Sequence, residues 1–244
     1  MMRWFVYLAK CLLSGLLVMQ MYFVLQIGLW AWFNPSGTAF ERAERWRLCG
    51  LHWSCPLYSN WVPYQQISPN LKRAVLVSED DIFFQHHGVR IEDMEKAWEK
   101  NQQKKGQSKT ALRGGSTITQ QLAKNLFLSS EQDYLRKGQE LLITAYLEAV
   151  LPKQRLFEIY LNSVEWGEGI FGIGAASQHY FATSPAALSR EESAALASAL
   201  PAPKCFDKAQ YCRRGSIDYA ARQEFILGSM DRIALSPISK SKPR

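Results

Sequence analysis

The stretch Gly114-Gly-Ser-Thr-Ile-Thr-Gln-Gln-Leu-Ala-Lys-Asn125 joins two glycines directly to a helical pattern. Thr117 and Gln120 form a capping box, in which each side chain accepts a hydrogen bond from the other residue's backbone N–H, and this predicts a helix running to about Leu128. The free N–H groups and the dipole of such a helix start favour an anion or a sugar. The lysine does not stand where a P-loop requires it, so a nucleotide phosphate site is not expected.

Helical patterns also fill most of the chain on both sides of this stretch. Pro69 lies at a first-turn position, Pro152 separates two helices, and Ser189 forms a second capping box with Glu192. A glycine-rich turn is expected over 167–174, and alternating strand patterns are missing. We therefore predict one all-α domain, with helices over residues 68–79, 91–103, 117–128, 134–151, 152–162, 175–181, 189–200 and 217–233.

The N-terminal region has 23 residues without a charge, from Cys11 to Phe33. As a helix they would extend about 34 Å, enough to cross a bilayer. Because Arg3 and Lys10 precede this run, the positive-inside rule places residues 1–10 in the cytoplasm and the rest of the chain on the far side. A cleaved signal peptide is the alternative, although its apolar core is shorter. We therefore expect a membrane anchor over 11–33, a linker over 34–55 and an exported domain over 56–244.

The formal net charge of +7 lies at the two ends of the chain. Residues 41–200 hold eighteen basic and eighteen acidic side chains, whereas residues 201–244 hold nine basic against four acidic. A neutral central part argues against a nucleic-acid partner and favours the membrane. Residues 100–113 (KNQQKKGQSKTALR) hold five basic residues and no acid, which is typical either of a solvated loop or of a positive flap beside an anionic ligand.

Four of the five cysteines form two local pairs outside the anchor, Cys49 with Cys55 and Cys205 with Cys212. Local disulfides suit an exported domain, and small buried thiols are the alternative. The histidines do not stand at the spacing of a zinc site relative to these cysteines.

The run Glu79-Asp80-Asp81 lies at the end of an apolar helical pattern and is followed by Phe83 and His86. Adjacent carboxylates repel one another, so one that enters a cleft would hold a proton more readily, as a general base near neutral pH requires. A solvated acidic helix end is the alternative.

The helix expected over 134–151 carries a second charged group, Arg136-Lys137-x-x-Glu140. Arg136 and Glu140 are four residues apart, which allows a structural salt bridge. Glu140 also adjoins an apolar run. Burial of a carboxylate is costly unless it is paired, so a partner or a functional role is expected for it. The apolar residues expected on the buried face of this helix are Leu135, Leu142, Ala145, Tyr146 and Ala149.

Together and in this order, these segments resemble the peptidoglycan glycosyltransferase family, and specifically its monofunctional, membrane-anchored members. The resemblance covers residues 56–205, and a transpeptidase domain, present in bifunctional relatives, is not expected in 244 residues. Five motifs in register make the signal specific. They are Glu79-Asp80-x-x-Phe83-x-x-His86-x-Gly88, Gly114–Gln121 with Lys124-Asn125, Arg136-Lys137-x-x-Glu140, Lys153–Phe181 and Ser189–Pro203.

The resemblance implies a lysozyme-like domain with a large lobe and a smaller membrane-proximal lobe. It implies an enzyme that polymerises lipid II with inversion and releases undecaprenyl pyrophosphate, without a nucleotide cofactor. Glu79 would be the catalytic base, and a catalytic Glu140 would orient basic side chains at the donor pyrophosphate or hold a divalent metal ion, Mg²⁺ or Mn²⁺. The residues implied to bind substrate are Asp80, Phe83, His86, Ser116, Thr117, Gln120, Gln121, Lys124, Asn125, Arg136 and Lys137.

The resemblance also implies a single-pass protein of the bacterial inner membrane with a periplasmic catalytic domain. Its partners would be lipid II, the growing glycan strand, the membrane and other cell-wall synthesis or division proteins. Two positions depart from the family pattern: Gln132, where Arg is frequent, and Gly174, where Glu is frequent. A muramidase or lytic transglycosylase of the same fold and an inactive membrane-tethered scaffold are the alternatives.

Overall fold

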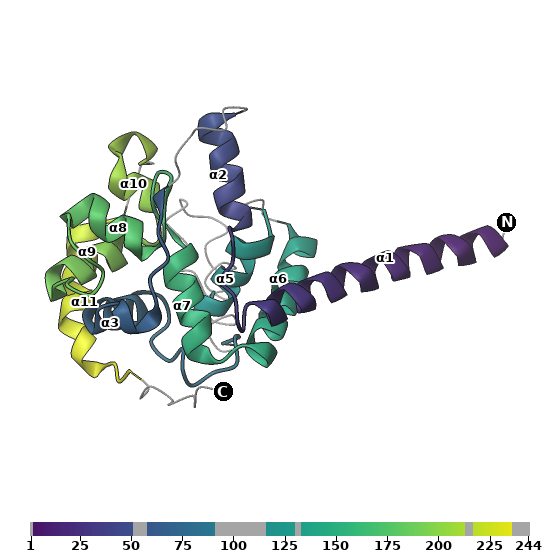
Figure 1. Ribbon diagram of the computed structural model, residues 1–244, viewed down its shortest axis with the longest axis horizontal. Helices are drawn as coiled ribbons and strands as arrows, with labels where there is room; N and C mark the ends of the chain where they lie inside the picture. The colour runs from purple at the N-terminus through teal and green to yellow at the C-terminus, as the bar shows by residue number, and fades with distance from the viewer. Residues whose placement is uncertain (1, 51–57, 91–115, 130–132, 213–216, 236–244) are drawn as a thin grey trace, which may run out of the picture.

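The computed structural model describes residues 2–50, 58–90, 116–129, 133–212 and 217–235. One long helix, α1 (Met2–Leu29), extends away from a body built mainly of shorter helices (Figure 1). The helices of the body are α2 (Ala39–Cys49), α3 (Pro69–Glu79), α5 (Ile118–Phe127), α6 (Tyr134–Val150), α7 (Lys153–Ser163), α8 (Gly172–Phe181), α9 (Arg190–Ala199), α10 (Pro203–Asp207) and α11 (Tyr219–Ser229), with 3₁₀ helices η1 (Tyr64–Gln66), η2 (Ala209–Tyr211) and η3 (Met230–Arg232).

Most predicted helices are confirmed, with ends within one residue for α3, α5, α6, α7 and α9. Both predicted capping boxes form, at Thr117 and at Ser189. The segment expected as a linker contains α2, which packs on α5. The helix expected over 91–103 lies outside the described residues.

A small sheet occupies part of the region expected to be a glycine-rich turn. Its strand β3 (Ile170–Phe171) pairs in parallel with β1 (Tyr58–Ser59) and antiparallel with β2 (Glu165–Gly167). The positive φ of Gly169 (72°) and Gly172 (76°) allows the chain to reverse after β2 and to enter α8. Strands of two or three residues are too short to show an alternating pattern, which is why the sequence did not predict them.

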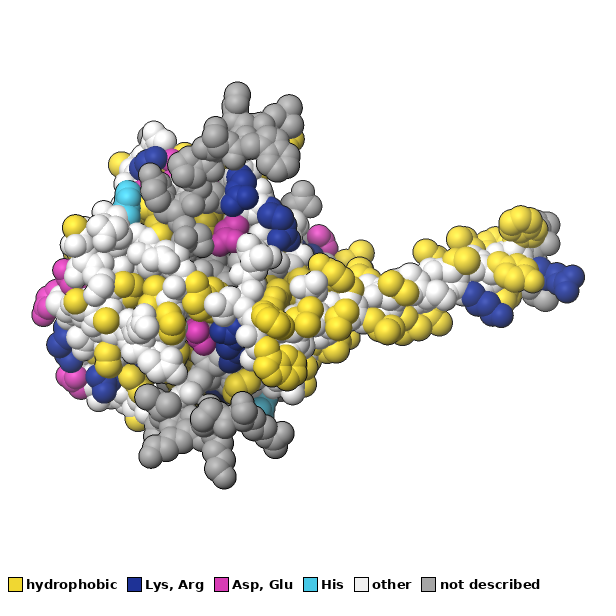
Figure 2. Space-filling model, in the orientation of Figure 1, with side chains coloured by type: hydrophobic (Ala, Val, Ile, Leu, Met, Phe, Trp, Pro, Cys, Tyr) yellow, Lys and Arg dark blue, Asp and Glu magenta, His cyan; other side chains and the backbone are white. Residues whose placement is uncertain are grey.

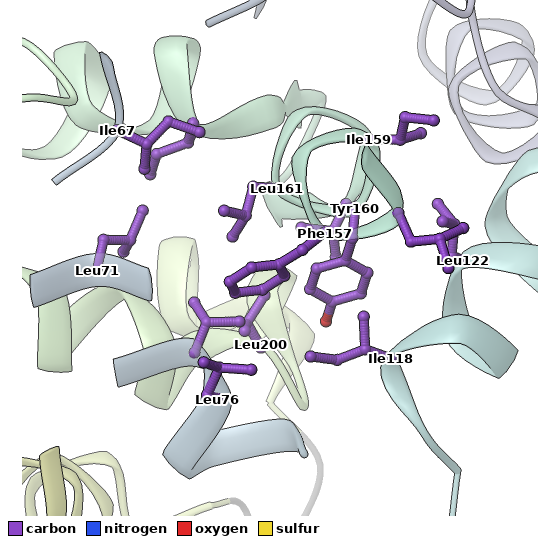
Figure 3. Packing of buried hydrophobic residues seen from close by; sticks show 14 of the residues in the cluster. Ile67, Leu71, Leu76, Ile118, Leu122, Phe157, Ile159, Tyr160, Leu161 and Leu200 are labelled. Carbon is purple, nitrogen blue, oxygen red and sulfur yellow. The ribbon is translucent and has the colours of Figure 1, made fainter. Parts of the chain in front are cut away.

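The core of the body surrounds α7, whose Phe157, Tyr160 and Leu161 are fully buried (Figure 3). Side chains from α3, α5 and the end of α9 close around them: Leu71, Leu76, Ile118, Leu122 and Leu200. The core therefore holds the C-terminal end of α3 next to the N-terminal end of α5, and these are the two places where most of the predicted site residues lie.

The helix α1 is long and apolar enough to cross a membrane over Arg3–Leu29, by length and composition. Its exposed apolar side chains continue without a break onto the adjoining side of the body (Figure 2). The predicted anchor over 11–33 is helical only to Leu29, and the next residues form turns.

The C-terminal end of α1 is packed into the body. The rings of Phe23 and Trp30 lie 5.0 and 5.1 Å from the ring of Phe127, at the end of α5. The guanidinium of Arg155 donates hydrogen bonds to the backbone oxygens of Trp30 (2.9 Å) and Phe33 (2.7 Å). These contacts join the C-terminal end of α1 to α5 and α7.

The buried face predicted for α6 is wrong except at Tyr146, which is partly buried and packs against the core. Leu135 is 89% exposed and Leu142 is 48% exposed, whereas Ile143, Thr144 and Leu147 face the core. The helix lies beside α1, which it contacts directly. An apolar stripe indicates burial away from water but does not distinguish a protein core from lipid. The exposed stripe of α6 therefore extends the apolar surface of α1.

The described cysteines outside α1 are disulfide-bonded. Cys205 and Cys212 form a disulfide, so the local pairing is confirmed there. Cys49 is also disulfide-bonded, while Cys55 lies outside the described residues. Cys11 is free and exposed on α1.

Candidate active site

The carboxylate of Glu79 stands at the last residue of α3 and faces α5 and α11. Its Oε2 accepts a hydrogen bond from Gln121 Nε2 at 2.9 Å. Its Oε1 accepts one from Ser78 Oγ at 2.7 Å and one from Arg222 Nη2 at 3.3 Å. The side chain is only 10% exposed. Three donors therefore hold a largely buried carboxylate in one orientation.

Gln121 owes its orientation to Tyr160. The Tyr160 hydroxyl donates to Gln121 Oε1 at 3.0 Å, which turns the amide nitrogen toward Glu79. Burial raises the pKa of Tyr160 well above its usual value, and the charges of Glu79 and Asp80 raise it further. Tyr160 thus remains a protonated donor at physiological pH, and it fixes the Gln121 amide in the orientation that Glu79 needs.

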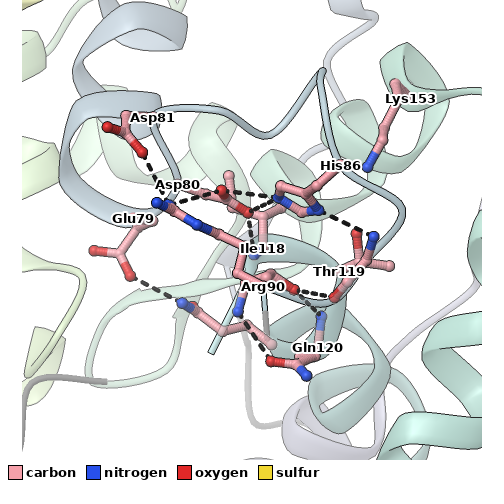
Figure 4. Close-up of polar contacts among 12 residues, drawn as sticks. Glu79, Asp80, Asp81, His86, Arg90, Ile118, Thr119, Gln120 and Lys153 are labelled. Atoms are coloured by element: carbon pink, nitrogen blue, oxygen red, sulfur yellow. Dashed lines mark hydrogen bonds and ion pairs between the residues drawn. The ribbon is translucent and has the colours of Figure 1, made fainter. Parts of the chain in front are cut away.

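Asp80 points the opposite way from Glu79 and is buried. His86 Nε2 lies 2.9 Å from its carboxylate, and the backbone N–H of Ile118 donates to Oδ2 at 3.1 Å (Figure 4). The N–H of Gly88 donates to His86 Nδ1, so Nε2 is the ring nitrogen that carries the proton toward Asp80. Asp80 thereby connects the end of α3 to the first residue of α5.

The remaining residues of the first motif divide between core and surface. Phe83 is fully buried against Phe84 and Phe157, with Lys153 Nζ 4.3 Å from its ring centre. Asp81 is 58% exposed and pairs with Arg90 at 2.9 Å. The structure places Asp80 and Phe83 inside the protein, where they hold the loop after α3. Their predicted contact with substrate stays a prediction.

The start of α5 is built by its capping box. Thr117 Oγ1 accepts from the N–H of Gln120 and donates to the carbonyl of Gly88 at 2.6 Å. Gln120 Oε1 accepts from the N–H of Thr117, while its buried Nε2 has no hydrogen-bond partner among the described residues. Ser116, just before the cap, is partly exposed. The side chains of Thr117 and Gln120 are thus used to cap α5. Ser116 is the most accessible of the three residues.

A cluster of charges lies farther along α5 and on the first turns of α6. The carboxylate of Glu140, 3% exposed, accepts from Arg136 Nη1 at 2.8 Å and from Lys137 Nζ. Both spacings were visible in the sequence as i, i+4 and i, i+3 pairs. Asn125 follows Lys124 on α5 and is buried. Its side chain forms no hydrogen bond among the described residues.

Lys124 belongs to the same cluster. Burial lowers the pKa of Lys124, the charges of Arg136 and Lys137 lower it further, and the carboxylate of Glu140 opposes them. Its ammonium lies 5.6 Å from the ring centre of Phe40, on α2. The cluster therefore holds three cations around one carboxylate, a net positive charge that favours an anion with several negative oxygens.

The side chains of the cluster offer few free ligands for a divalent metal ion. Glu140 is the carboxylate of the cluster, and each of its oxygens already accepts from a cation. Groups of three or more metal-ligating side chains do not occur among the described residues. Mg²⁺ requires several oxygen ligands, so these side chains alone do not fit a protein-built metal site.

The two halves of the site are joined by α5. Gln121, which holds Glu79, and Lys124, which belongs to the cationic cluster, are three residues apart on this helix, about 4.5 Å along its axis. A largely buried carboxylate at the end of α3 and a cationic cluster on α5 and α6 therefore both adjoin α5, at residues three positions apart.

Two residues of the site were missed by the sequence analysis. Arg222 lies 143 positions from Glu79 on α11, beyond all five motifs, and only the packing of α11 on α3 brings it there. Tyr160 was part of the fourth motif but had no assigned role. The flap expected over 100–113, the glycines Gly114 and Gly115, and Gln132 lie outside the described residues.

Comparison with known proteins agrees with this arrangement. The transglycosylase family matches residues 51–231. A protein named biosynthetic peptidoglycan transglycosylase from Cupriavidus metallidurans is 58% identical over 235 residues, which is 96% of this chain and 99% of its own. Proteins of the same name from Cupriavidus pinatubonensis and Ralstonia nicotianae are 56% and 52% identical, over 96% of this chain and 92% and 99% of theirs.

The match covers most of the body, and the predicted all-α, lysozyme-like domain with one N-terminal apolar helix is confirmed. Glu79, the start of α5 and the Glu140 cluster belong to the first three of the five sequence motifs. The chain belongs to the transglycosylase family.

Proposed function

We propose that this protein polymerises lipid II into linear peptidoglycan glycan strands. One arrangement supports this most directly. Gln121 of α5 orients the carboxylate of Glu79, and Lys124, about one helical turn along α5, belongs to the cationic cluster. Glycosyl transfer from a lipid pyrophosphate needs a base at the attacking hydroxyl and positive charge at the leaving group. The two halves of the site supply these two requirements.

In the reaction, the 4-hydroxyl of an acceptor disaccharide attacks C1 at the lipid-linked end of the growing glycan. Glu79 takes the hydroxyl proton as the new C1–O bond forms. The bond between C1 and the pyrophosphate oxygen breaks with inversion at C1, and undecaprenyl pyrophosphate leaves with the electron pair of that bond.

The cluster would offset the charge that develops on the leaving pyrophosphate. Lys124, Arg136 and Lys137 supply the positive charge, and Glu140 orients Arg136 and Lys137 from within the helix. Ser116, Gln121 and Asn125 stay predicted contacts to sugar and phosphate oxygens. Preorganised charge in a partly buried site is worth far more than the same charge in water.

The proposal includes a divalent ion, Mg²⁺ or Mn²⁺, that would bind together with the substrate. Since Glu140 is paired with two cations, such an ion would take most of its ligands from pyrophosphate oxygens and water. Treatment with EDTA should then lower activity, and addition of either metal should restore it. Full activity in EDTA would remove the ion from the proposal.

The apolar surface supports a membrane-bound substrate. The helix α1 and the exposed stripe of α6 form one apolar surface next to the Glu140 cluster, which also lies on α6. We place the chain in the bacterial inner membrane, with the N-terminus cytoplasmic and the domain periplasmic. A phosphatase that is active only in the periplasm, fused to the C-terminus, should be active, and an inactive fusion would reverse the orientation. Contacts with other cell-wall synthesis or division proteins stay a prediction.

The decisive experiment gives purified full-length protein fluorescent lipid II. The wild-type chain should make glycan strands, and Glu79→Gln should abolish synthesis while circular dichroism and melting temperature are unchanged. Asp81→Asn is the matched control, because Asp81 is the exposed neighbour in the same acidic run and should leave synthesis intact. Digestion of finished sacculi without synthesis would instead favour a hydrolase, and absence of both would favour a scaffold.

A further inference from the structure

The carboxylate of Glu79 stands where a helix disfavours negative charge. Glu79 is the last residue of α3, where the backbone carbonyls have no partner within the helix and the helix dipole is negative. Asp80 follows directly and adds a second negative charge. Hydrogen-bond donors and positive charge next to Glu79 therefore offset an unfavourable local field.

Glu79 is surrounded by polar groups from several packed elements. Ser78 of α3 is a neutral donor, while Asp80 faces His86 and Arg90, and Asp81 faces Arg90. The groups that contact Glu79 or Ser78 from the other packed elements are the Gln121 amide of α5, the Tyr160 hydroxyl of α7 through Gln121, the Ala197 carbonyl of α9 and the Arg222 guanidinium of α11. Among the described residues, Arg222 is the cation that forms an ion pair with Glu79.

Arg222 contacts the end of α3 at three points through a single nitrogen. Its Nη2 lies 3.1 Å from the carbonyl oxygen of Ser78, 2.8 Å from Ser78 Oγ and 3.3 Å from Glu79 Oε1. It thus satisfies a carbonyl left free at the helix end and places positive charge beside the carboxylate. The side chain is 31% exposed, so this ion pair is shielded from solvent but not buried.

The same contacts make the two oxygens of Glu79 unequal. Oε1 accepts from Ser78 and from Arg222, whereas Oε2 accepts only from Gln121 among the described residues. A carboxylate oxygen has two lone-pair positions. Oε2 therefore keeps one open and is the oxygen able to receive a proton from an acceptor hydroxyl.

We propose that Arg222 is a positioning residue for Glu79, which places positive charge beside the carboxylate and holds it turned so that Oε2 faces the acceptor hydroxyl. The proposal rests on the proposed role of Glu79 as the base. Arg222 acts through Glu79 and Ser78. Its replacement should therefore change the pH dependence of the reaction rather than the affinity for substrate.

The test compares three variants of the full-length protein in nanodiscs with fluorescent lipid II, across about pH 5 to 9. Arg222→Gln keeps hydrogen-bonding ability but removes the positive charge beside Glu79. The acid limb of kcat/KM should then move up by about one pH unit, with activity about tenfold lower on the acid side and nearly normal at the alkaline end. KM should change less than about twofold. Arg222→Lys should restore most of the acid limb.

Arg190→Gln is the matched control. Arg190 lies on α9 and pairs with Asp231 of η3 at 2.8 Å, in the same group of packed helices but without contact to Glu79. Its removal should leave the pH profile unchanged.

A profile of Arg222→Gln that coincides with wild type, or a loss that is equal at every pH, would overturn the proposal. If Arg222→Gln does not fold, as judged by melting temperature, the Lys variant carries the test: it keeps the charge, so a shifted acid limb there would also overturn it. Activity in Glu79→Gln would contradict the proposed function itself. An inactive Glu79→Gln together with an unmoved Arg222→Gln profile would contradict only the present proposal.

Discussion

Gln20 of α1 and Gln139 of α6 exchange two hydrogen bonds, with each Nε2 donating to the other's Oε1 at 3.0 and 3.2 Å. Gln20 lies within the apolar stretch that is long enough to cross a membrane. A polar side chain in lipid bonds to another polar side chain because the alternative is an unpaired group in hydrocarbon. The pair therefore helps to set how α1 is rotated against α6.

Replacement of either glutamine by leucine should leave the other amide unpaired. Gln20→Leu or Gln139→Leu should each lower the free energy of unfolding by about 1 kcal/mol, and the double variant should cost less than the sum of the two. The measurement is a double-mutant cycle on thermal unfolding in nanodiscs. Gln26→Leu is the control, since the Gln26 side chain makes no hydrogen bond among the described residues. Additive losses at Gln20 and Gln139 would show that the pair contributes nothing.

Lys124 should limit activity at high pH. Its pKa is lowered by burial and by neighbouring cations, so it loses its proton at a lower pH than a free lysine does. As pH rises, the neutral amine no longer offsets pyrophosphate charge, and activity should fall. Lys124→Arg keeps its charge throughout this range and should extend the alkaline limb to higher pH.

Polymerisation rates between about pH 7 and 10.5 measure this effect. Lys208→Arg is the control, because Lys208 is solvent-exposed and pairs with Glu168 away from the cluster. An alkaline limb that does not move in Lys124→Arg would assign that limb to another group.

Local signals predicted the site more completely than long-range ones. The capping box at Thr117 and the spacing of Arg136 and Glu140 are complete within four residues, so the sequence contains the whole interaction. The contact between Glu79 and Arg222 depends on how α11 packs on α3, and no spacing along the chain encodes it.

The fold was predictable for the same reason, with one instructive error. Helix ends follow from caps and prolines, which act over a few residues. The wrong face of α6 was chosen because Leu135 and Leu142 are as apolar as core residues, although they lie on the exposed side that adjoins α1. Hydrophobic periodicity indicates which side chains avoid water. It does not distinguish burial in a protein core from burial in lipid.

Glu165 should make stability depend on pH. Burial raises the pKa of this β2 carboxyl to about 7; the ammonium of Lys204, 3.5 Å away, opposes the rise, and the charge of Glu44 adds to it. The folded state thus binds a proton more tightly than the unfolded chain, whose carboxyl has the ordinary value of 4.5. The resulting stabilisation is full below about pH 4.5 and is lost as pH rises through 7, a change of at most about 3 kcal/mol.

Urea unfolding at several pH values between about 5 and 8 measures this dependence. Glu165→Gln should flatten it and should be more stable than wild type at pH 8. Glu191→Gln, an exposed glutamate on α9, should leave the slope unchanged. A wild-type slope retained in Glu165→Gln would assign the dependence to another group.

Gly174, one of the two departures from the family pattern, is required by close packing. A Cβ at this position of α8 would lie 2.4 Å from the carbonyl oxygen of Asn60 and 3.0 Å from Val62 Cγ2. The segment cannot simply move aside, because Asn162 accepts from the N–H of Val62 at 2.8 Å and donates to its carbonyl at 2.9 Å. An added methyl group must therefore displace backbone that is held by two hydrogen bonds.

Gly174→Ala should lower the free energy of unfolding by roughly 1–3 kcal/mol, although alanine is the better helix former. Gly228→Ala in α11 is the matched control: a Cβ there meets nothing within 4 Å, so the variant should be as stable as wild type or slightly more stable. Thermal unfolding of both variants separates the steric cost from helix propensity. Equal stability of the two variants would mean that the segment at Asn60 adjusts freely, and that Gly174 is not needed for its packing against α8.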